Sequence, residues 1–295
     1  MINTIKIKEK IIEKALFFSA LITILTTIGI IWVLFSQSFS FFKEVSIVEF
    51  FTDKNWTPLF AEKHFGILPL ISGTLLITVI AISLALPIGL TIAVFLNEYA
   101  PKKFSKTVKP LLEILAAVPT VVYGYFALVV VTPVLQKLIP GLSGFNALSP
   151  GIVMGIMIIP FISSLSEDAL RSVPKSLREA SYGMGASRFQ TSFKVLVPAA
   201  SSGIISSVIL ALSRAIGETM IVTIAAGQQP RLTINPLGPI ETITAYIVQV
   251  SSGDVPQDSV EYRTIFAAGV TLFIFTFLLN NISHWIKNRI QEKYE

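Results

Sequence analysis

The 295-residue sequence contains no cysteine and only two histidines, His64 and His284. The absence of cysteine excludes disulfides, thiol nucleophiles and zinc–cysteine sites. Neither histidine has neighbours at metal-ligand spacing, so we expect surface or interfacial residues and no metal site. The phosphate-binding motif G-x-x-x-x-G-K-[ST] is also absent. If the protein depends on ATP, the ATPase must therefore be another chain.

Charged residues are scarce as well. They make up 14% of the chain, against about 25% in a typical soluble domain. Hydrophobic residues make up 53%, and the mean hydropathy is +0.72. This composition indicates an integral membrane protein. The formal net charge of +5 could suggest a nucleic-acid partner. However, the positive residues are spread over several loops and form no single basic groove, so no nucleic acid is expected.

Six apolar runs reach the length of about 20 residues that a spanning helix needs. None alternates with period two, which disfavours a membrane barrel, and backbone groups in lipid must bond within their own segment. We therefore predict an all-α protein with six transmembrane helices. The runs cover 15–35, 67–96, 114–136, 138–166 (with its helix starting near Ser149), 201–226 and 264–286. The first run is longer than a signal-peptide core and precedes no cleavage site, so we expect it to be retained.

The lysines and arginines fix the predicted orientation. With a cytoplasmic N-terminus, sixteen of them fall on the inner side, six on the outer side, and Arg214 in the membrane. This excess follows the positive-inside rule, so both termini are expected in the cytoplasm. The outer loop at 36–65 is rich in aromatic residues, which is typical of an interfacial helix but also suits a docking surface. The other long outer loop is 228–262.

The inner loop at 167–200 contains a short amphipathic helix. Pro174 suits its first turn, and Leu177, Ala180 or Ser181, and Met184 fall on one face. The periodicity alone fits two interpretations. Such a helix can rest on the membrane surface, or it can insert its apolar face into a groove on a partner protein.

Arg214 and Glu218 are the only charges between Val195 and Ala226. Arg214 lies 13 residues after Ser201, about 20 Å along a helix, near mid-bilayer. A charge there costs at least ~2.5–3.5 kcal/mol, so the pair should face the bundle interior or a wet cavity. Either the two form an internal salt bridge, or Arg214 serves an anion pathway and Glu218 holds it. Thr219, Ser213 and Tyr123 are pathway candidates by polarity alone.

Three stretches of the sequence resemble a known family. The inner loop is similar to the E-A-A-x3-G-x9-I-x-L-P signature of ATP-binding-cassette importer permeases, with Ser, Val and Val at three positions. In that family this loop forms the coupling helix, which sits in a cleft of the ATPase subunit. The matching residues are Glu179, Ala180, Ser181, Gly185, Val195, Val197 and Pro198, and by the same resemblance Leu177 also couples to the ATPase.

The segments "AAVPTVVYGYFAL" and "SRAIGETM" resemble the phosphate-importer permeases, and the long first outer loop resembles the PstC type. The resemblance implies the type I importer fold and partners that are a PstA-like permease, two PstB-like ATPases and a PstS-like extracytoplasmic phosphate-binding protein. Membrane lipid surrounds the chain. The chain itself would bind no cofactor, because ATP and Mg stay on the ATPase. The location would be a bacterial or archaeal cytoplasmic membrane. The pathway residues would be Arg214, Glu218 and Thr219.

The resemblance also suggests domain boundaries and leaves alternatives. We expect an N-terminal tail, first helix and outer loop at 1–66, the permease domain at 67–288 and a cytoplasmic tail at 289–295. The anion could instead be sulfate or molybdate. A secondary transporter would leave the inner loop without a purpose. A membrane enzyme lacks an acid–base pair, because Glu98 and Glu113 have no partner at catalytic spacing and are expected to flank helix ends.

Overall fold

The computed structural model describes residues 2–290, with side chains except at 2–8, 102, 283, 284 and 286–290. The side chain of His284 is not among those described, and residues 291–295 of the predicted tail lie outside the described residues. The elements are α1 (Ile2–Phe42), α2 (Ile47–Thr52), α3 (Leu68–Val94), η1 (Phe95–Tyr99), α4 (Lys102–Ala117), α5 (Thr120–Phe126), η2 (Ala127–Val131), α6 (Thr132–Leu138), α7 (Leu148–Ser172), α8 (Lys175–Gly183), α9 (Arg188–Thr191), η3 (Ser192–Leu196), α10 (Val197–Ala199), α11 (Ser201–Ile216), α12 (Met220–Ala225), α13 (Ile243–Ser251) and α14 (Val260–Ile290), where η marks a π-helical turn.

The predicted all-α class is confirmed. Over residues 2–290 the structure contains helices and two isolated bridges, Trp56 with Phe65 and Gly227 with Ile240, but no strand. Among the described residues, five helices are long and apolar enough to span a membrane, and α9–α10 with α11 makes a sixth if that bent pair counts as one span. The apolar runs form helices because a backbone in hydrocarbon can satisfy its polar groups only within the segment.

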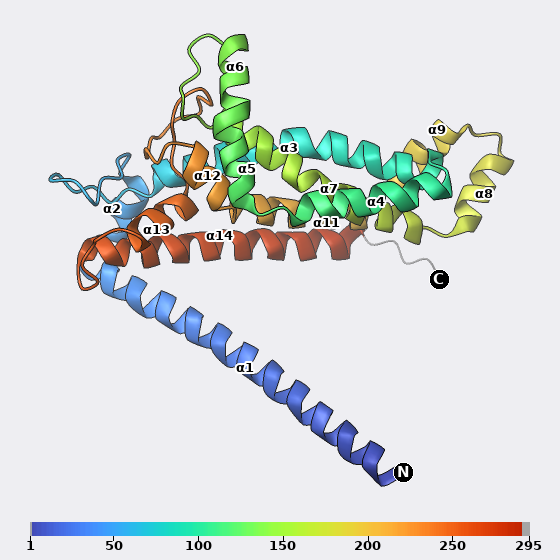
Figure 1. The fold of residues 1–295 in the computed structure, drawn as a ribbon, viewed down its shortest axis with the longest axis horizontal. Helices are drawn as coiled ribbons and strands as arrows, with labels where there is room; N and C mark the ends of the chain where they lie inside the picture. Colours follow the sequence, from blue (N-terminus) through green and yellow to red (C-terminus); the bar gives the residue numbers. More distant parts are fainter. Residues whose placement is uncertain (1, 291–295) are drawn as a thin grey trace.

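Helices α3, α7, α11 and α14 run side by side along the long axis of the molecule (Figure 1). Helices α8 and α9 lie at one end of this bundle, and α2, α12 and α13 lie toward the other. In the same view, α5 and α6 rise steeply away from the bundle axis. Helix α1 packs against α14 near its own C-terminal end and then diverges. Its residues 9–30 are all exposed, which leaves an apolar surface for lipid.

Two predicted spans differ in detail from the structure. The run 114–136 is not one helix, because α4 ends at Ala117 and Pro119 precedes a new helix, α5. The run 201–226 is likewise broken: α11 ends at Ile216, Gly217 is its C-cap, and α12 begins at Met220. The sequence-based interpretation of 201–226 as one continuous helix is therefore wrong. Its high apolar content concealed a helix end whose cap residue is a glycine.

The contact between α3 and α7 depends on residues without side chains. A Cβ on Gly155 of α7 would lie 2.9 Å from the Ala81 carbonyl oxygen and 2.8 Å from Leu84 Cδ2 on α3. A Cβ on Gly151 would lie 2.7 Å from Ile80 Cγ2. Small residues at such positions let two membrane helices approach closely, since packing rather than hydrophobic exclusion drives their association in lipid.

We expect Gly155→Val to separate α3 from α7 and to lower the free energy of unfolding by roughly 1–3 kcal/mol through overpacking. Thermal unfolding of the purified protein in detergent measures the effect. Gly29→Val is the matched control, because nothing lies within 4 Å of a Cβ built on Gly29. Equal melting temperatures for the two variants would contradict this account of the packing.

Candidate functional site

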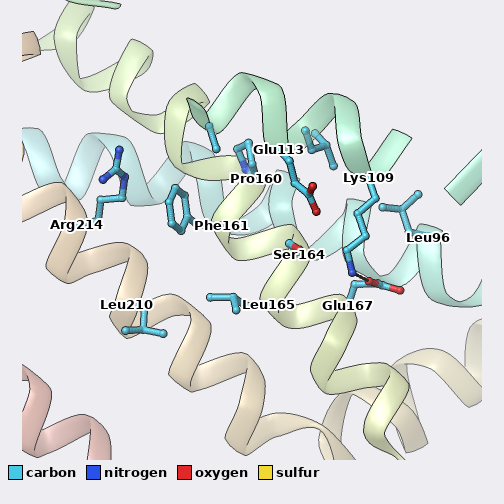
Figure 2. A pocket seen from close by; sticks show the side chains of 12 residues that line it. Leu96, Lys109, Glu113, Pro160, Phe161, Ser164, Leu165, Glu167, Leu210 and Arg214 are labelled. Atoms are coloured by element: carbon cyan, nitrogen blue, oxygen red, sulfur yellow. Dashed lines mark hydrogen bonds and ion pairs between the residues drawn. The ribbon is translucent and has the colours of Figure 1, made fainter. Parts of the chain in front are cut away.

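A cleft of about 390 Å³ lies between α4, α7, α11 and η1. Most of its wall is apolar, but Arg214 stands at one end, Lys109 with Glu167 at the other, and the Glu113 carboxylate lies between them (Figure 2). Lys109 and Glu167 are at the end nearer α8, since α7 continues from Glu167 to Ser172 just before α8. The remaining lining residues are Leu96, Leu112, Glu113, Ala116, Pro160, Phe161, Ser164, Leu165 and Leu210.

Arg214 enters the cleft from the last turn of α11. Its guanidinium carbon lies 4.9 Å from the centre of the Phe161 ring, a cation–π contact, and its side chain reaches the Met157 sulfur at 3.9 Å. The Nε of Arg214 is buried and has no hydrogen-bond partner. A cation–π contact is worth about 0.5–2 kcal/mol. That is less than the ~2.5–3.5 kcal/mol that a mid-membrane cation costs. None of the ion pairs among the described side chains includes Arg214, so these contacts do not compensate its charge.

The predicted salt bridge between Arg214 and Glu218 is absent, although both side chains are described. Because α11 ends at Ile216, Glu218 is not one turn further along the same helix. Its carboxylate instead accepts hydrogen bonds from the backbone N–H groups of Met220 and Ile221, at 3.2 and 3.5 Å. These are free N–H groups at the start of α12, where a negative charge is favourable. Glu218 does not line the cleft.

At the other end of the cleft the charges are compensated. Lys109 Nζ lies 2.7 Å from Glu167 Oε2 and 2.9 Å from Asp168 Oδ1. Arg171 donates to the second oxygen of Glu167, whose side chain is 1% exposed. The buried carboxylate thus has two cationic partners, and Lys109 has two acidic ones. Of the cations that line the cleft, Arg214 is the one without a carboxylate partner.

Three other pathway candidates form hydrogen bonds with groups other than Arg214. The Thr219 hydroxyl donates to the Gly217 carbonyl at 3.3 Å, and Ser213 donates to Asn280 on α14 at 3.2 Å. The Tyr123 hydroxyl donates to the Leu115 carbonyl on α4 at 2.6 Å. None of the three lines the cleft. Their assignment to the pathway stays a prediction.

The predicted amphipathic helix of the inner loop is α8, and Pro174 is its N-cap. Leu177 turns toward the bundle and packs against the cluster of Ala93, Leu170 and Leu196. Ser181 bonds Thr191 on α9 through their hydroxyls at 2.9 Å. Gly185 has φ +80°, a left-handed conformation that side chains rarely adopt, and so permits the turn between α8 and α9. Glu179 and Ala180 are exposed.

The apolar surface that α8 and α9 present to solvent differs from the predicted one. Met184, at the end of α8, is 89% exposed, and Phe189 on α9 is 64% exposed. The rings of Phe189 and Phe193 contact each other at a tilt of 39°, with ring centres 4.7 Å apart. Because Leu177 faces inward, the free apolar side chains of this tip are Met184 and these two rings. The 3.6-residue period could not reveal this, since two of them follow the turn at Gly185.

An ion pair connects α8 to the end of α3. Arg178 donates to Glu98 Oε1 at 2.6 Å, and the Glu98 side chain is only 3% exposed. Glu98 lies in η1, so it flanks a helix end as predicted, whereas Glu113 lies within α4 and that expectation is wrong. Leu96, two residues before Glu98, lines the cleft. The α8 helix and the cleft wall are thus joined through one π-helical turn.

The polar groups of the cleft are suited to binding a charged ligand. Among the described residues, no group of three or more His, Cys, Asp or Glu side chains could hold a metal ion. The cleft has no nucleophile–base pair: Ser164 is its one hydroxyl group, and no histidine lines it. A guanidinium without a carboxylate partner is suited to an oxyanion, to which it can offer two parallel hydrogen bonds. The sequence singled out Arg214 but missed Phe161, Lys109 and Glu167, which come from distant segments.

Comparisons with known proteins identify the family of the chain. The family described as "Binding-protein-dependent transport system inner membrane component" matches residues 85–293. A "Probable ABC transporter permease protein YqgH" of Bacillus subtilis is 37% identical over 245 residues, covering 83% of this chain and 79% of that protein. A "Phosphate transport system permease protein PstC" of Mesorhizobium japonicum is 34% identical over 266 residues, covering 83% and 79%.

Solved structures show the same fold. An alginate ABC transporter chain aligns with a TM-score of 0.61 and 18% identity, covering 92% of this chain and 96% of that one. A chain of the MetNI methionine ABC transporter, in an inward-facing conformation, aligns with a TM-score of 0.59 and 20% identity, covering 76% and 96%. The protein is therefore a multi-pass membrane protein that belongs to the family of inner membrane components of binding-protein-dependent transport systems.

Proposed function

We propose that the chain is a permease subunit of an ATP-driven importer of inorganic phosphate and forms half of its translocation pathway. The observation that carries the proposal is Arg214, a cation that faces a largely apolar cleft, has no ion-pair partner and has a buried Nε without a hydrogen bond. A planar guanidinium matches the oxygens of phosphate. Relatives named as phosphate permeases, including one from Methanocaldococcus jannaschii that is 32% identical over 250 residues, favour phosphate over sulfate or molybdate.

The cleft would hold the anion only briefly, which transport requires. Lys109 is neutralised by Glu167 and Asp168, so one free cation attracts the anion instead of two. Glu113 adds a carboxylate to the lining. A site with several free cations would bind phosphate too strongly to release it, whereas conduction needs contacts weak enough to leave. Glu218 and Thr219 would also belong to the pathway. They lie at the break between α11 and α12, four and five residues after Arg214.

The energy would come from other chains. A PstA-like permease would complete the pathway, two PstB-like subunits would bind ATP and Mg and hydrolyse the nucleotide, and a PstS-like protein would deliver phosphate from outside. The chain itself would catalyse no reaction. The exposed tip of α8 and α9 supports docking to the ATPase, because Met184 and Phe189 are large apolar side chains with no cover in this chain.

Movement of α8 would reach the cleft through the ion pair between Arg178 and Glu98. Glu98 belongs to η1, whose Leu96 is part of the cleft wall. A π-helical turn is a frequent feature of functional sites and gives the end of α3 a local irregularity that can shift. We place α8 and both termini in the cytoplasm, as the distribution of lysine and arginine predicts.

We expect Arg214→Ala to lower the rate of labelled-phosphate uptake at least tenfold, because the cleft loses its uncompensated cation. Uptake is measured in cells that carry this chain as the sole copy, with sulfate and molybdate as competitors. Co-purification of the complex checks assembly, and Arg231→Ala, which removes an exposed arginine of the outer loop, is the control. Unchanged uptake, or competition by sulfate as strong as by phosphate, would refute the proposal.

We expect Met184→Asp to reduce co-purification of the ATPase subunit roughly tenfold or more, since a carboxylate would be buried in an apolar contact. Ile234→Asp is the matched control. Ile234 is 91% exposed, like Met184, but it lies in the loop between α12 and α13, away from α8 and α9. If the complex with the ATPase subunit stays intact in Met184→Asp, then α8 and α9 do not form the interface.

We expect Arg178→Met to leave the buried Glu98 carboxylate unpaired, at a local cost on the order of 3 kcal/mol. Amide hydrogen exchange across 175–183 should rise, and ATP hydrolysis should continue with less uptake per ATP. In the control Arg171→Met, Glu167 keeps Lys109 as partner and the lost side chain is 62% exposed, so the cost should stay below about 1 kcal/mol. Equal exchange in both variants would show that the α8–η1 ion pair positions nothing.

A further inference from the structure

A second cavity, of about 410 Å³, lies at the end of the molecule opposite α8. Its walls come from the loop before α3, the loop between α12 and α13, and α13 itself. The lining includes the rings of Trp56, Phe60 and Tyr246, together with Gln228, Gln249 and Glu241. Phe60 is 66% exposed, so the cavity can be reached from outside. Neither the cleft nor the α8 surface uses any of these residues.

Glu241 is the unusual member of this set. Glu241 is 1% exposed, and its Oε1 is buried without a hydrogen-bond partner. None of the ion pairs within residues 9–282 includes it. A buried carboxyl group without a partner is costly, because it has left water and gained nothing in return. Burial raises the pKa of Glu241 to about 8. An entering cation could therefore ionise it near neutral pH at a small cost.

The walls around Glu241 are fixed before any ligand arrives. Trp56 and Tyr246 meet edge to face with ring centres 5.0 Å apart, and the Tyr246 hydroxyl bonds Thr264 at 2.6 Å. The loop that carries Trp56 is closed by the contact of His64 Nδ1 with Asp53 Oδ2 at 2.8 Å. A Cβ on Gly73 of α3 would lie 2.1 Å from the Glu241 carbonyl oxygen, so the Glu241 backbone packs directly on that helix.

A cavity lined by three aromatic rings and one buried carboxylate is suited to an organic cation. A guanidinium or ammonium group is attracted by aromatic rings and paired by the carboxylate. A metal ion would need more than the single acidic ligand present. An adjacent hollow shares Pro58, Leu59 and Phe60 with this cavity and carries Asp254 and Glu261, of which Glu261 is paired with Lys63. Asp254, which none of the ion pairs among the described side chains includes, would favour a positively charged partner at this opening.

We propose that this cavity receives a lysine or arginine side chain of the extracytoplasmic binding protein when that protein docks, with Glu241 as its counter-ion. The proposal rests on the proposed function, which places this end of the chain outside the cell and requires a binding protein there. The buried position of Glu241 makes the contact selective, because only a side chain long enough to cross the aromatic rim reaches the carboxylate.

The test measures ATP hydrolysis by the assembled importer in proteoliposomes while the binding protein is titrated. We expect Glu241→Gln, which keeps the size of the side chain, to raise the half-saturating concentration of binding protein at least tenfold and to leave basal hydrolysis unchanged. The control Glu261→Gln changes a rim carboxylate outside the cavity and should shift that concentration less than threefold. A half-saturating concentration equal to wild type in Glu241→Gln would overturn the proposal. A lowered maximal rate at every concentration, without a shift, would also overturn it.

A direct binding measurement separates this proposal from the proposed function. Trp56 lines the cavity, so n-propylguanidinium should change the tryptophan fluorescence of the wild-type complex and not that of Glu241→Gln. If the binding protein stimulates wild-type hydrolysis but n-propylguanidinium produces no Glu241-dependent signal, the cation site is wrong and the importer function stands. If the guanidinium binds but no binding protein stimulates hydrolysis, the importer function and the assigned occupant both fail.

Discussion

The arrangement depends on one uncompensated positive charge inside an apolar cleft. Arg214 is placed by the last turn of α11, covered on one side by Phe161, and left without a carboxylate. The energy it gains from the aromatic ring is smaller than the cost of a cation at that depth. In the function proposed here, a passing anion would supply this deficit, and an anion that supplies it only in part could leave again.

The rest of the bundle keeps that charge available. Glu218, the acidic neighbour in sequence, is occupied by the free N–H groups of α12 and does not reach Arg214. The acidic residue nearest the other end of the cleft, Glu167, is saturated by Lys109 and Arg171. The close packing of α3 against α7 at Gly151 and Gly155 holds the helix that carries Phe161. The partners of Glu218 and Glu167 therefore determine the charge at the two ends of the cleft: Arg214 stays without a carboxylate, and Lys109 is paired.

Much of the architecture could be predicted from the sequence. An apolar run of about 20 residues forms a helix in lipid, because only a helix satisfies its backbone polar groups within the segment. The helical class and most spans therefore followed from hydropathy alone. The breaks did not follow. Pro119 and Gly217 interrupt runs whose hydropathy is continuous, and the Gly217 break cancelled the expected i, i+4 pairing of Arg214 with Glu218. Contacts between distant segments, such as Lys109 with Glu167, could not be predicted either, because one sequence does not reveal which helices pack together.

The most direct test of the account is the position of the anion in the assembled importer. A structure of the complex in lipid, loaded with phosphate and arrested before ATP hydrolysis, should show tetrahedral density within hydrogen-bond distance of the Arg214 guanidinium, between α7 and α11. An Arg214 that is paired with a protein carboxylate, with phosphate bound on a path that does not pass it, would contradict the account.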